Sequence, residues 1–520
     1  MSKVMKKTRS NEQELEFGGP IGAAILIIWS HYILYYFWYC YAKHNGELYI
    51  PSSFSDLNKE IHEFIKLFMD EGIPDIKTCG AYFSFFFFQI LLAAYVPGWI
   101  GEGVPIDSKG TRMKYLCNGY LCYYICLWGF FLMHNLRYFY EATCLDKLFG
   151  DFISAESLDF YKATHLCDNF GRYITTAIIV ADVTSIFWYL YGIKTQSKEE
   201  ENSRTKNVLY DFFIGTIIYP RIGIVDVKMI AECRWSWLTL MLLTISCAIK
   251  QAEVNKDNGG WITKEMGMMV LAHWLYSNAT VKGEHYIPCT WDMFHERFGW
   301  MLNFWNTAGV PYLYCFQSFY ILKNYKPINE SNSVFYVAFA YGLLLLGYYI
   351  FDSANCQKAS IKMPGIERNT FPQVPWSILR HQPIRYIETP RGNLLLDGWY
   401  AFARKLQYTG DLMMALSWGL ICGPPSWKNI LNYFYFIFFL GMIIHRQSRD
   451  EVRCKAKYGE YWDVYTKEVP NVFIPSNKLF GFFFSKNKTL PPIQLPKHLV
   501  FDKSKSTFTA NAGKKKTKFS

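Results

Sequence analysis

Four basic residues near the C-terminal end of the last long apolar run share one side of a predicted helix. Arg446, Arg449, Arg453 and Lys457 recur three or four residues apart, a spacing that places them on one stripe. Like charges on one stripe repel each other unless an anion lies there. Asp450 lies among them and can pair with Arg446 one turn earlier. The stripe predicts either contact with lipid headgroups or a pocket for a multiply charged anion such as a dinucleotide pyrophosphate.

Two more polar stretches adjoin apolar runs in the C-terminal part of the chain. Asn355, Lys358 and Lys362 share one helical face at the end of the run 333–351. Residues 394–411 combine two aromatic residues, a basic pair, Tyr408 and Asp411 just before another apolar run. Helix bundles usually build a cofactor site where polar helix ends converge. We therefore expect a cofactor pocket in the C-terminal half.

Long runs without charge indicate the elements that position these residues. A helix needs about 20 apolar residues to cross the hydrocarbon core of a membrane. Six runs are long enough and four are shorter: 21–41, 79–100, 115–133, 173–193, 298–322 and 333–351, then 235–249, 266–281, 412–425 and 429–444. Backbone groups in lipid must be satisfied within the segment, so the runs are helices. We expect an all-α polytopic membrane protein with about ten transmembrane helices.

The composition excludes several other classes of protein. Charged residues make up 19% of the chain and aromatic residues another 19%, whereas soluble proteins average about 25% charged residues. The 14 cysteines form no CxxC pair and the 11 histidines form no HxxxH box, so we expect no disulfide framework and no metal site. GxGxxG, GxxxxGK[ST] and GxSxG motifs are also missing from the sequence. Nucleic acid is a poor partner for a chain that mostly faces lipid.

The basic residues predict the orientation in the membrane. Lys and Arg collect in residues 1–9, 351–409 and 446–467 and in the C-terminal tail. The positive-inside rule places these segments in the cytosol, together with both termini. In the tail, Lys516 and Lys518 have the spacing of a cytosolic dilysine retrieval signal of the endoplasmic reticulum, a spacing that a basic tail also produces by chance.

Several polar residues interrupt the apolar runs, where they are costly and often functional. They are His273, Asn278, Lys282, Glu284, His285, Asp292 and Glu296. For each of them a satisfied hydrogen bond between helices is the alternative to a function. Asp182 lies alone within the run 173–193, and we expect it either to make an internal hydrogen bond or to lie at the luminal end of its helix.

Longer motifs carry a family resemblance. Residues 220–228 (PRIGIVDVK), 271–278 (LAHWLYSN) and 298–312 (FGWMLNFWNTAGVPY) are similar to segments of the sterol reductase family of the endoplasmic reticulum. The similarity extends from about residue 16 to 475. The delta-14 and delta-7 reductases resemble FGDLxWVPF in the last segment, whereas this chain has WNTAGVPY at 305–312. That difference is typical of the branch that reduces the C24(28) double bond of the sterol side chain.

The resemblance implies a ten-helix enzyme of the endoplasmic reticulum membrane, with NADPH in a cytosol-facing pocket and a membrane sterol as substrate. It implies reduction of the C24(28) double bond, the last step of ergosterol synthesis, by protonation and then hydride transfer. The alternatives are a delta-14 sterol reductase and a non-catalytic sterol-binding membrane protein. Partners in a sterol-synthesis complex are also left open.

The resemblance also implies which residues contact NADPH. They are Lys358, Lys362, Leu395, Tyr400, Gln407, Tyr408, Asp450, Cys454, Lys455, Ala456, Lys457, Tyr458 and Tyr465. Lys362 and Tyr400 replace an Arg and a Trp that are frequent in relatives, and Gln407 replaces an Asn. Since Lys cannot bind phosphate in the bidentate manner of Arg, the preference for NADPH over NADH is less secure.

Reduction of an isolated double bond requires a proton donor as well as hydride. Asp450 and Tyr465 are the first candidate pair, and Tyr408 and Asp411 are the second; all four could instead only hold NADPH. His273, Trp274, Trp305 and Asn306 are the candidates for lining the sterol cavity, with helix packing as the alternative.

Four parts of the chain follow from these predictions. Residues 1–20 form a cytosolic N-terminus, and 21–325 form an N-terminal transmembrane part with sterol-facing helices. Residues 326–480 form a C-terminal transmembrane part with the NADPH pocket, and 481–520 form a basic flexible tail.

Overall fold

The computed structural model describes most of the chain. The described residues are 15–106, 110–143, 158, 161–195, 204–205, 207–324, 333–362, 385–474, 496 and 499. The side chains of residues 258 and 359–362 are not included. The predictions for residues 1–14, for most of the tail 481–520 including its dilysine spacing, and for the Lys362 side chain lie outside this part of the chain.

The described chain is mainly helical, with three two-stranded antiparallel hairpins. The longer helices are α2 (Gly19–Lys43), α3 (Phe54–Leu67), α4 (Ile76–Tyr95), α5 (Gly119–His134), α9 (Phe170–Thr195), α13 (Trp237–Val254), α14 (Lys264–Lys282), α19 (Val334–Lys362), α20 (Leu406–Ile421) and α21 (Phe434–Tyr458). The hairpins pair β1 (Trp99–Pro105) with β2 (Arg112–Cys117), β3 (Arg221–Ile222) with β4 (Val225–Asp226), and β5 (Tyr386–Ile387) with β6 (Leu394–Leu395).

Five helices within the described ranges are long and apolar enough to cross a membrane. They cover Glu16–Lys43, Ile76–Tyr95, Phe170–Thr195, Val227–Val254 and Val334–Lys358. The helix α5 is apolar but shorter, with 16 residues. A mainly helical membrane architecture is therefore supported, while the other spans of the expected ten stay predictions.

One charge-free run is longer than its helix. The run 79–100 suggests a helix to residue 100, but α4 ends at Tyr95 and strand β1 begins at Trp99. Pro97 lies between them and has no backbone N–H to continue the helix. The side-chain amide of Asn118 donates to three carbonyl oxygens at the end of α4, at 2.6–3.3 Å. This amide takes the place of the missing helical donors.

A second run, 298–322, is not one continuous helix. It forms α16 (Trp300–Phe304), a π-helical turn η7 (Trp305–Gly309), α17 (Val310–Leu313) and α18 (Phe316–Lys323). Pro311 cannot donate the backbone hydrogen bond that would continue a regular α-helix from η7. π-Helical turns inside helices often mark functional segments.

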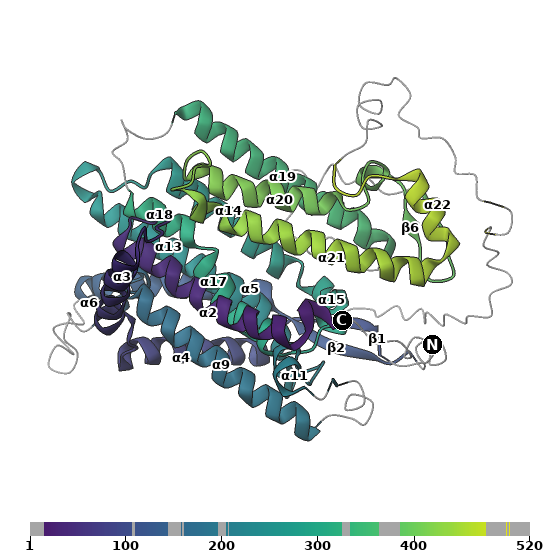
Figure 1. Cartoon of the computed structure of the whole chain (residues 1–520), viewed down its shortest axis with the longest axis horizontal. Coiled ribbons are helices and arrows are strands. Elements are labelled where there is room, and N and C mark those ends of the chain that lie inside the picture. The colour runs from purple at the N-terminus through teal and green to yellow at the C-terminus, as the bar shows by residue number, and fades with distance from the viewer. Residues whose placement is uncertain are drawn as a thin grey trace. The chain divides into compact units, whose positions relative to one another are not determined.

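The chain forms two compact units, whose elements are labelled in Figure 1. The first unit comprises residues 1–346 and 413–439, and the second comprises 347–412 and 440–520. Helices α19, α20 and α21 contribute residues to both units. All predicted catalytic and cofactor residues belong to the second unit, and the four predicted sterol-contacting residues belong to the first.

The core of the second unit lies between a short hairpin and the last helices. Hairpin β5–β6 packs with α22 (Glu460–Glu468) through Ile387, Leu394, Trp462 and Tyr465, all buried. Figure 1 shows α22 beside β6. This packing fixes the chain that follows the apolar part of α21, where the basic stripe was predicted.

Candidate functional site

Helices α19 and α20 approach closely in the second unit. A Cβ atom built at Gly410 would lie 2.6 Å from the carbonyl oxygen of Gly347 and 2.7 Å from the backbone nitrogen of Phe351. Only glycine permits this approach. The crossing positions the polar stretch before α20 next to the part of α19 that carries Lys358.

The centre of the site is an ion pair between residues from two predicted polar stretches. The Lys405 ammonium group donates to Oδ2 of Asp450. The side chains of Lys405 and Asp450 are 11% and 24% exposed, so both are largely shielded from water. The Cys454 thiol donates to the other Asp450 oxygen at 3.7 Å. The pair thus connects the start of α20 to the polar end of α21.

More than one cation acts on Asp450. Burial alone would raise the pKa of this carboxyl group, but Lys405, then Lys358 and Arg453, bring it below its ordinary value. Burial likewise opposes protonation of Lys405, but Asp450 holds the pKa of Lys405 above its ordinary value. Both groups are therefore ionised at neutral pH. Lys405, Lys358 and Arg453 thus all act on one carboxylate, and cationic side chains of this kind bind phosphate groups.

A second group of predicted cofactor residues surrounds Tyr400. The Tyr400 hydroxyl donates to Oε1 of Gln407 at 3.2 Å, and Tyr400 packs with Leu395 and Ala354. Burial, followed by the neighbouring phenols of Tyr465 and Tyr408, raises the pKa of Tyr400. The structure therefore brings four predicted residues together, namely Leu395, Tyr400, Gln407 and Tyr408.

Tyr465 lies in the buried core of the second unit and is 5% exposed. Its ring packs on Trp462 at 5.1 Å between ring centroids. Burial raises the pKa of the Tyr465 phenol, although Arg404 partly offsets this effect. The phenol keeps its proton at neutral pH, whereas the Asp450 carboxyl has lost its own.

The segment Cys454–Tyr458 forms the polar end of α21. The Arg391 guanidinium donates to the carbonyl oxygen of Lys457 at 2.9 Å and to that of Ala456 at 3.4 Å. These carbonyls lie in the last turn of the helix and lack helical donors. Lys455 pairs with Asp463, and the Lys457 ammonium lies 4.7 Å from the ring centroid of Tyr458. Arg391 and Asp463 thus both bind the segment, the first through backbone carbonyls and the second through the Lys455 side chain.

The second catalytic pair occupies the start of α20. The Tyr408 ring lies 6.5 Å from the ring of Phe473, and Tyr408 is only partly buried. Asp411 lies one turn later and is 7% exposed. Both candidates therefore lie on the helix that follows Lys405.

Several residues that support the site were not predicted. Arg404 donates to the carbonyl oxygens of Val469 and Pro470 at 2.9 and 3.1 Å and contacts Glu451 at 3.4 Å. Glu451 also accepts from the indole N–H of Trp462 at 2.7 Å. The basic pair Arg404–Lys405 is the feature of the sequence that could have pointed to Arg404, but nothing in the sequence indicates which acids the pair contacts.

The four candidates for the sterol cavity lie in the first unit. The ring of His273 on α14 is fully buried, its Nδ1 lies 2.6 Å from Thr244 Oγ1, and it packs edge-on against Trp418 at 4.5 Å. Trp305 stacks on Phe438 at 4.8 Å between ring centroids. Asn306 follows in η7 and is 9% exposed.

A chain of aromatic contacts connects two of these candidates. From Trp418 the contacts continue to Tyr435 at 4.6 Å, Tyr314 at 4.3 Å, Phe438 at 6.5 Å and then Trp305. Trp274 packs instead against the separate core cluster around Tyr123. His273 and Trp305 therefore share an aromatic environment that Trp274 does not share.

Comparisons with known proteins show which family this chain resembles. Residues 11–477 match the model of the ergosterol biosynthesis ERG4/ERG24 family. The chain is 34% identical over 468 residues to a Delta(24(24(1)))-sterol reductase of Gibberella zeae, covering 89% of this chain and 73% of that protein. It is 32% identical over 475 residues to Delta(24(24(1)))-sterol reductase erg4A of Aspergillus fumigatus, with coverage of 89% and 92%.

Another relative is named for a different activity. The chain is 30% identical over 461 residues to a Delta(14)-sterol reductase of Methylotuvimicrobium alcaliphilum, covering 88% of this chain and 95% of that protein. With the family model matched over most of the chain, these relatives show that this protein belongs to the ergosterol biosynthesis ERG4/ERG24 family of sterol reductases.

Proposed function

We propose that this protein reduces the C24(28) double bond of a sterol side chain with NADPH, in the endoplasmic reticulum membrane. The observation that carries the proposal is the similarity over 89% of the chain to two proteins named Delta(24(24(1)))-sterol reductase. The segment 305–312 supports the same branch of the family, because it differs from the form typical of delta-14 and delta-7 reductases.

The second unit offers groups that suit NADPH. Lys358, Lys405 and Arg453 all act electrostatically on Asp450, and Lys and Arg are the side chains that bind the phosphates of a dinucleotide. Tyr465 and Tyr408 both act electrostatically on Tyr400, and aromatic side chains of this kind stack on the planar rings of a dinucleotide. In this proposal Asp450 orients Lys405 and the neighbouring cations.

The chemistry requires an acid beside the double bond. An isolated alkene has no place for the electron pair of an incoming hydride, so C28 must gain a proton first or at the same time. Protonation at C28 leaves a tertiary cation at C24. NADPH, when bound, supplies the hydride that converts this cation into the reduced side chain. The residues around it must exclude water, which would otherwise trap the cation.

The protonation states distinguish which candidates can donate a proton. Asp450 is paired with Lys405 and ionised, so it accepts hydrogen bonds and has no proton to give. The phenol of Tyr465 keeps its proton because burial raises its pKa. We therefore propose that a phenol, Tyr465 first and Tyr408 second, donates the proton, and that Asp450 acts through the cofactor site.

Three variants of the purified protein in lipid nanodiscs test these roles. We expect Tyr465→Phe to lose turnover by about 100-fold or more, the range of a general acid, while it still binds NADPH. Asp450→Asn should weaken NADPH binding. Tyr461→Phe, on the same helix as Tyr465, is the matched control and should keep both turnover and NADPH binding. Near wild-type turnover of both Tyr465→Phe and Tyr408→Phe would contradict the assignment of the donor.

Reduction of the ring C14 double bond is the second candidate. The observation in its favour is the 30% identity to a Delta(14)-sterol reductase over 88% of the chain. A deletion strain separates the two reactions. Accumulation of sterols with a 24(28)-methylene group supports the first, and accumulation of 14,15-unsaturated sterols supports the second.

A further inference from the structure

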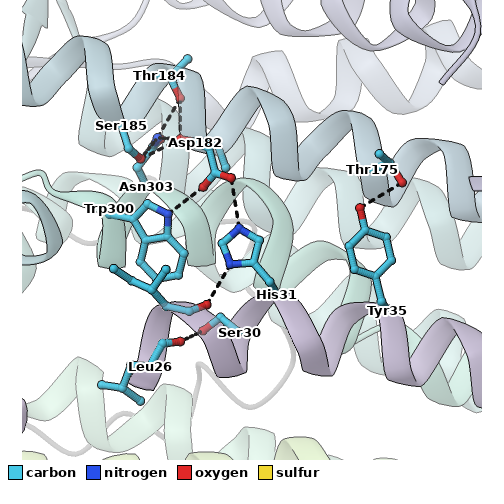
Figure 2. A network of polar contacts seen from close by, with 12 residues as sticks. Leu26, Ser30, His31, Tyr35, Thr175, Asp182, Thr184, Ser185, Trp300 and Asn303 are labelled. Atoms are coloured by element: carbon cyan, nitrogen blue, oxygen red, sulfur yellow. Dashed lines mark hydrogen bonds and ion pairs between the residues drawn. The ribbon is translucent and has the colours of Figure 1, made fainter. Parts of the chain in front are cut away.

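Asp182, which the catalytic proposal does not use, belongs to a polar network between membrane-spanning helices. Its Oδ2 lies 3.0 Å from Nε2 of His31 on α2, and its Oδ1 accepts from the indole N–H of Trp300 at 2.8 Å. Figure 2 shows the carboxylate between these two rings. The expected internal hydrogen bond of Asp182 is thus confirmed.

The hydrogen bonds determine where the protons are. His31 Nδ1 lies 2.8 Å from the carbonyl oxygen of Ile27, and since a carbonyl can only accept, Nδ1 carries a proton. Nε2 faces a carboxylate, so a second proton must lie between Nε2 and Oδ2. The pair therefore holds one shared proton and is neutral as a whole. A neutral pair is the form that tolerates membrane depth best.

The pair lies midway along two helices that could each span a membrane. His31 is at the middle of the 25 residues of α2, and Asp182 is at the middle of the 26 residues of α9. Both helices are long and apolar enough to span the hydrocarbon core. The alternative position of Asp182 at the luminal end of its helix is therefore wrong. Little water reaches this depth to satisfy polar groups.

The pair is also partly exposed at the surface of its two helices. The side chains of His31 and Asp182 are 30% and 35% exposed. The residues beside them on the helix surfaces are strongly exposed aliphatic side chains, Ile28 on α2 and Ile179 and Val183 on α9, at 50–70%. Each carboxylate oxygen has a lone pair beyond the one it uses. Asp182 can thus accept a further hydrogen bond from the lipid side.

Other contacts already hold the helices together. The side-chain amide of Asn303 on α16 lies within 2.9 Å of the Ala181 carbonyl, Thr184 Oγ1 and Ser185 Oγ, all on α9. The Tyr35 hydroxyl donates to Thr175 Oγ1 at 3.2 Å and connects α2 to α9. Figure 2 draws both sets of contacts. A charged pair is not needed to join these helices.

We propose that the His31–Asp182 pair is a hydrogen-bonding anchor for the hydroxyl group of a sterol that docks on the lipid-facing surface of α2 and α9. The proposal rests on the proposed function for the choice of a sterol as ligand. A sterol has one hydroxyl donor for Asp182 and a rigid apolar body for the aliphatic side chains around it. An anionic headgroup offers no such match, because it cannot leave the membrane surface at low cost.

A binding measurement without NADPH tests the anchor independently of turnover. The full-length protein in phosphatidylcholine nanodiscs is titrated with tritiated 24-methylenecholesterol and with its 3-O-methyl ether, which cannot donate a hydrogen bond. For the wild type we expect the free sterol to bind about tenfold more tightly than the ether, as one hydrogen bond to a charged group would give. Asp182→Leu should bring this ratio close to one.

Two further variants control for folding and helix packing. Asp182→Asn keeps the size of the side chain and should lower the ratio without unfolding the protein. Tyr35→Phe removes a hydrogen bond between the same two helices and should leave the ratio unchanged. A ratio near one in the wild type, or a tenfold ratio in both Asp182 variants, would overturn the proposal. Equal competition by diacylglycerol, another hydroxyl-bearing lipid, would overturn the choice of a sterol.

The outcomes separate this inference from the proposed function. If the protein reduces the sterol but binds the free sterol and its ether with equal affinity, the proposed reductase function stands and the anchor is wrong. If the free sterol binds more tightly than its ether in a manner that depends on Asp182, but NADPH is not oxidised, the anchor stands and the proposed reaction is wrong.

Discussion

Lys405 and Asp450 lie 45 residues apart in the sequence and form a largely shielded ion pair in the second unit. Lys405 precedes helix α20, and Asp450 lies beyond the apolar part of α21. The pair joins two of the three polar stretches whose residue types suggest a cofactor site, and Lys358 of the third stretch acts on the same carboxylate.

Loss of one partner should destabilise the protein more than loss of both. Lys405→Met leaves the Asp450 carboxylate shielded without its main cation, which we expect to cost about 1–3 kcal/mol. The double variant Lys405→Met/Asp450→Leu should recover part of that loss. Chemical denaturation of the single and double variants in the same detergent measures the coupling. Additive effects of the two substitutions would contradict a direct interaction.

The pair should stabilise the fold only within a window of pH. The pKa of Asp450 is lowered on folding, so its contribution is present above the unfolded pKa of about 3.9 and is lost as the pH falls through the folded value. The pKa of Lys405 is raised, so its contribution is present below about 10.4 and is lost at higher pH. The difference in melting temperature between wild type and Lys405→Met should therefore shrink toward both extremes. A difference independent of pH would exclude the ion pair as its cause.

The close crossing of α19 and α20 predicts a strict requirement for glycine. Gly410→Ala places a methyl group 2.6 Å from the Gly347 carbonyl oxygen, and we expect a loss of about 1–3 kcal/mol as the helices separate. NADPH binding should weaken as well, because the crossing positions Lys358 and Lys405. Gly441→Ala is the control, since a methyl group there meets nothing within 4 Å. Equal behaviour of the two variants would show that the crossing has no role.

Lys228 should be important for folding of the first unit. Lys228 is 2% exposed, and its ammonium group donates to the carbonyl oxygens of Asp292, Met293 and Glu296 at 2.9, 3.3 and 2.5 Å. Lys228→Met leaves these carbonyls without that donor, and we expect a loss of about 2–3 kcal/mol. Lys256→Met, at an exposed position, should change the melting temperature very little. A harmless Lys228→Met substitution would contradict this role.

The sequence predicts helices better than it predicts their ends. A run without charge measures hydrophobicity, and four of the expected spans coincide with long apolar helices that cover residues 21–41, 173–193, 235–249 and 333–351. Such a run contains no information on whether the backbone can continue its helical hydrogen bonds. Pro97 ends α4 early, and a turn at Tyr314 and Cys315 separates α17 from α18 within the run 298–322, although none of these residues adds a charge.

The candidate site shows a similar limit. Helical spacing of Arg446, Arg449, Arg453 and Lys457 predicts a basic stripe, because that pattern is local. The partner of Asp450 is not local: Lys405 comes from a different helix, and only the folded chain brings the two together. In the same way, His31 and Asp182 each look like an isolated polar residue in the sequence, and their pairing needs the packing of α2 on α9.

The position of transferred deuterium tests the central claim most directly. Purified protein in nanodiscs receives NADPH labelled with deuterium at the transferring position and a sterol that carries either a 24(28)-methylene group or a 14,15 double bond. The account predicts oxidation of NADPH with the first sterol only, with deuterium at C24 and a solvent proton at C28. Deuterium at C14 of the second sterol would contradict it, and so would the absence of NADPH oxidation with both sterols.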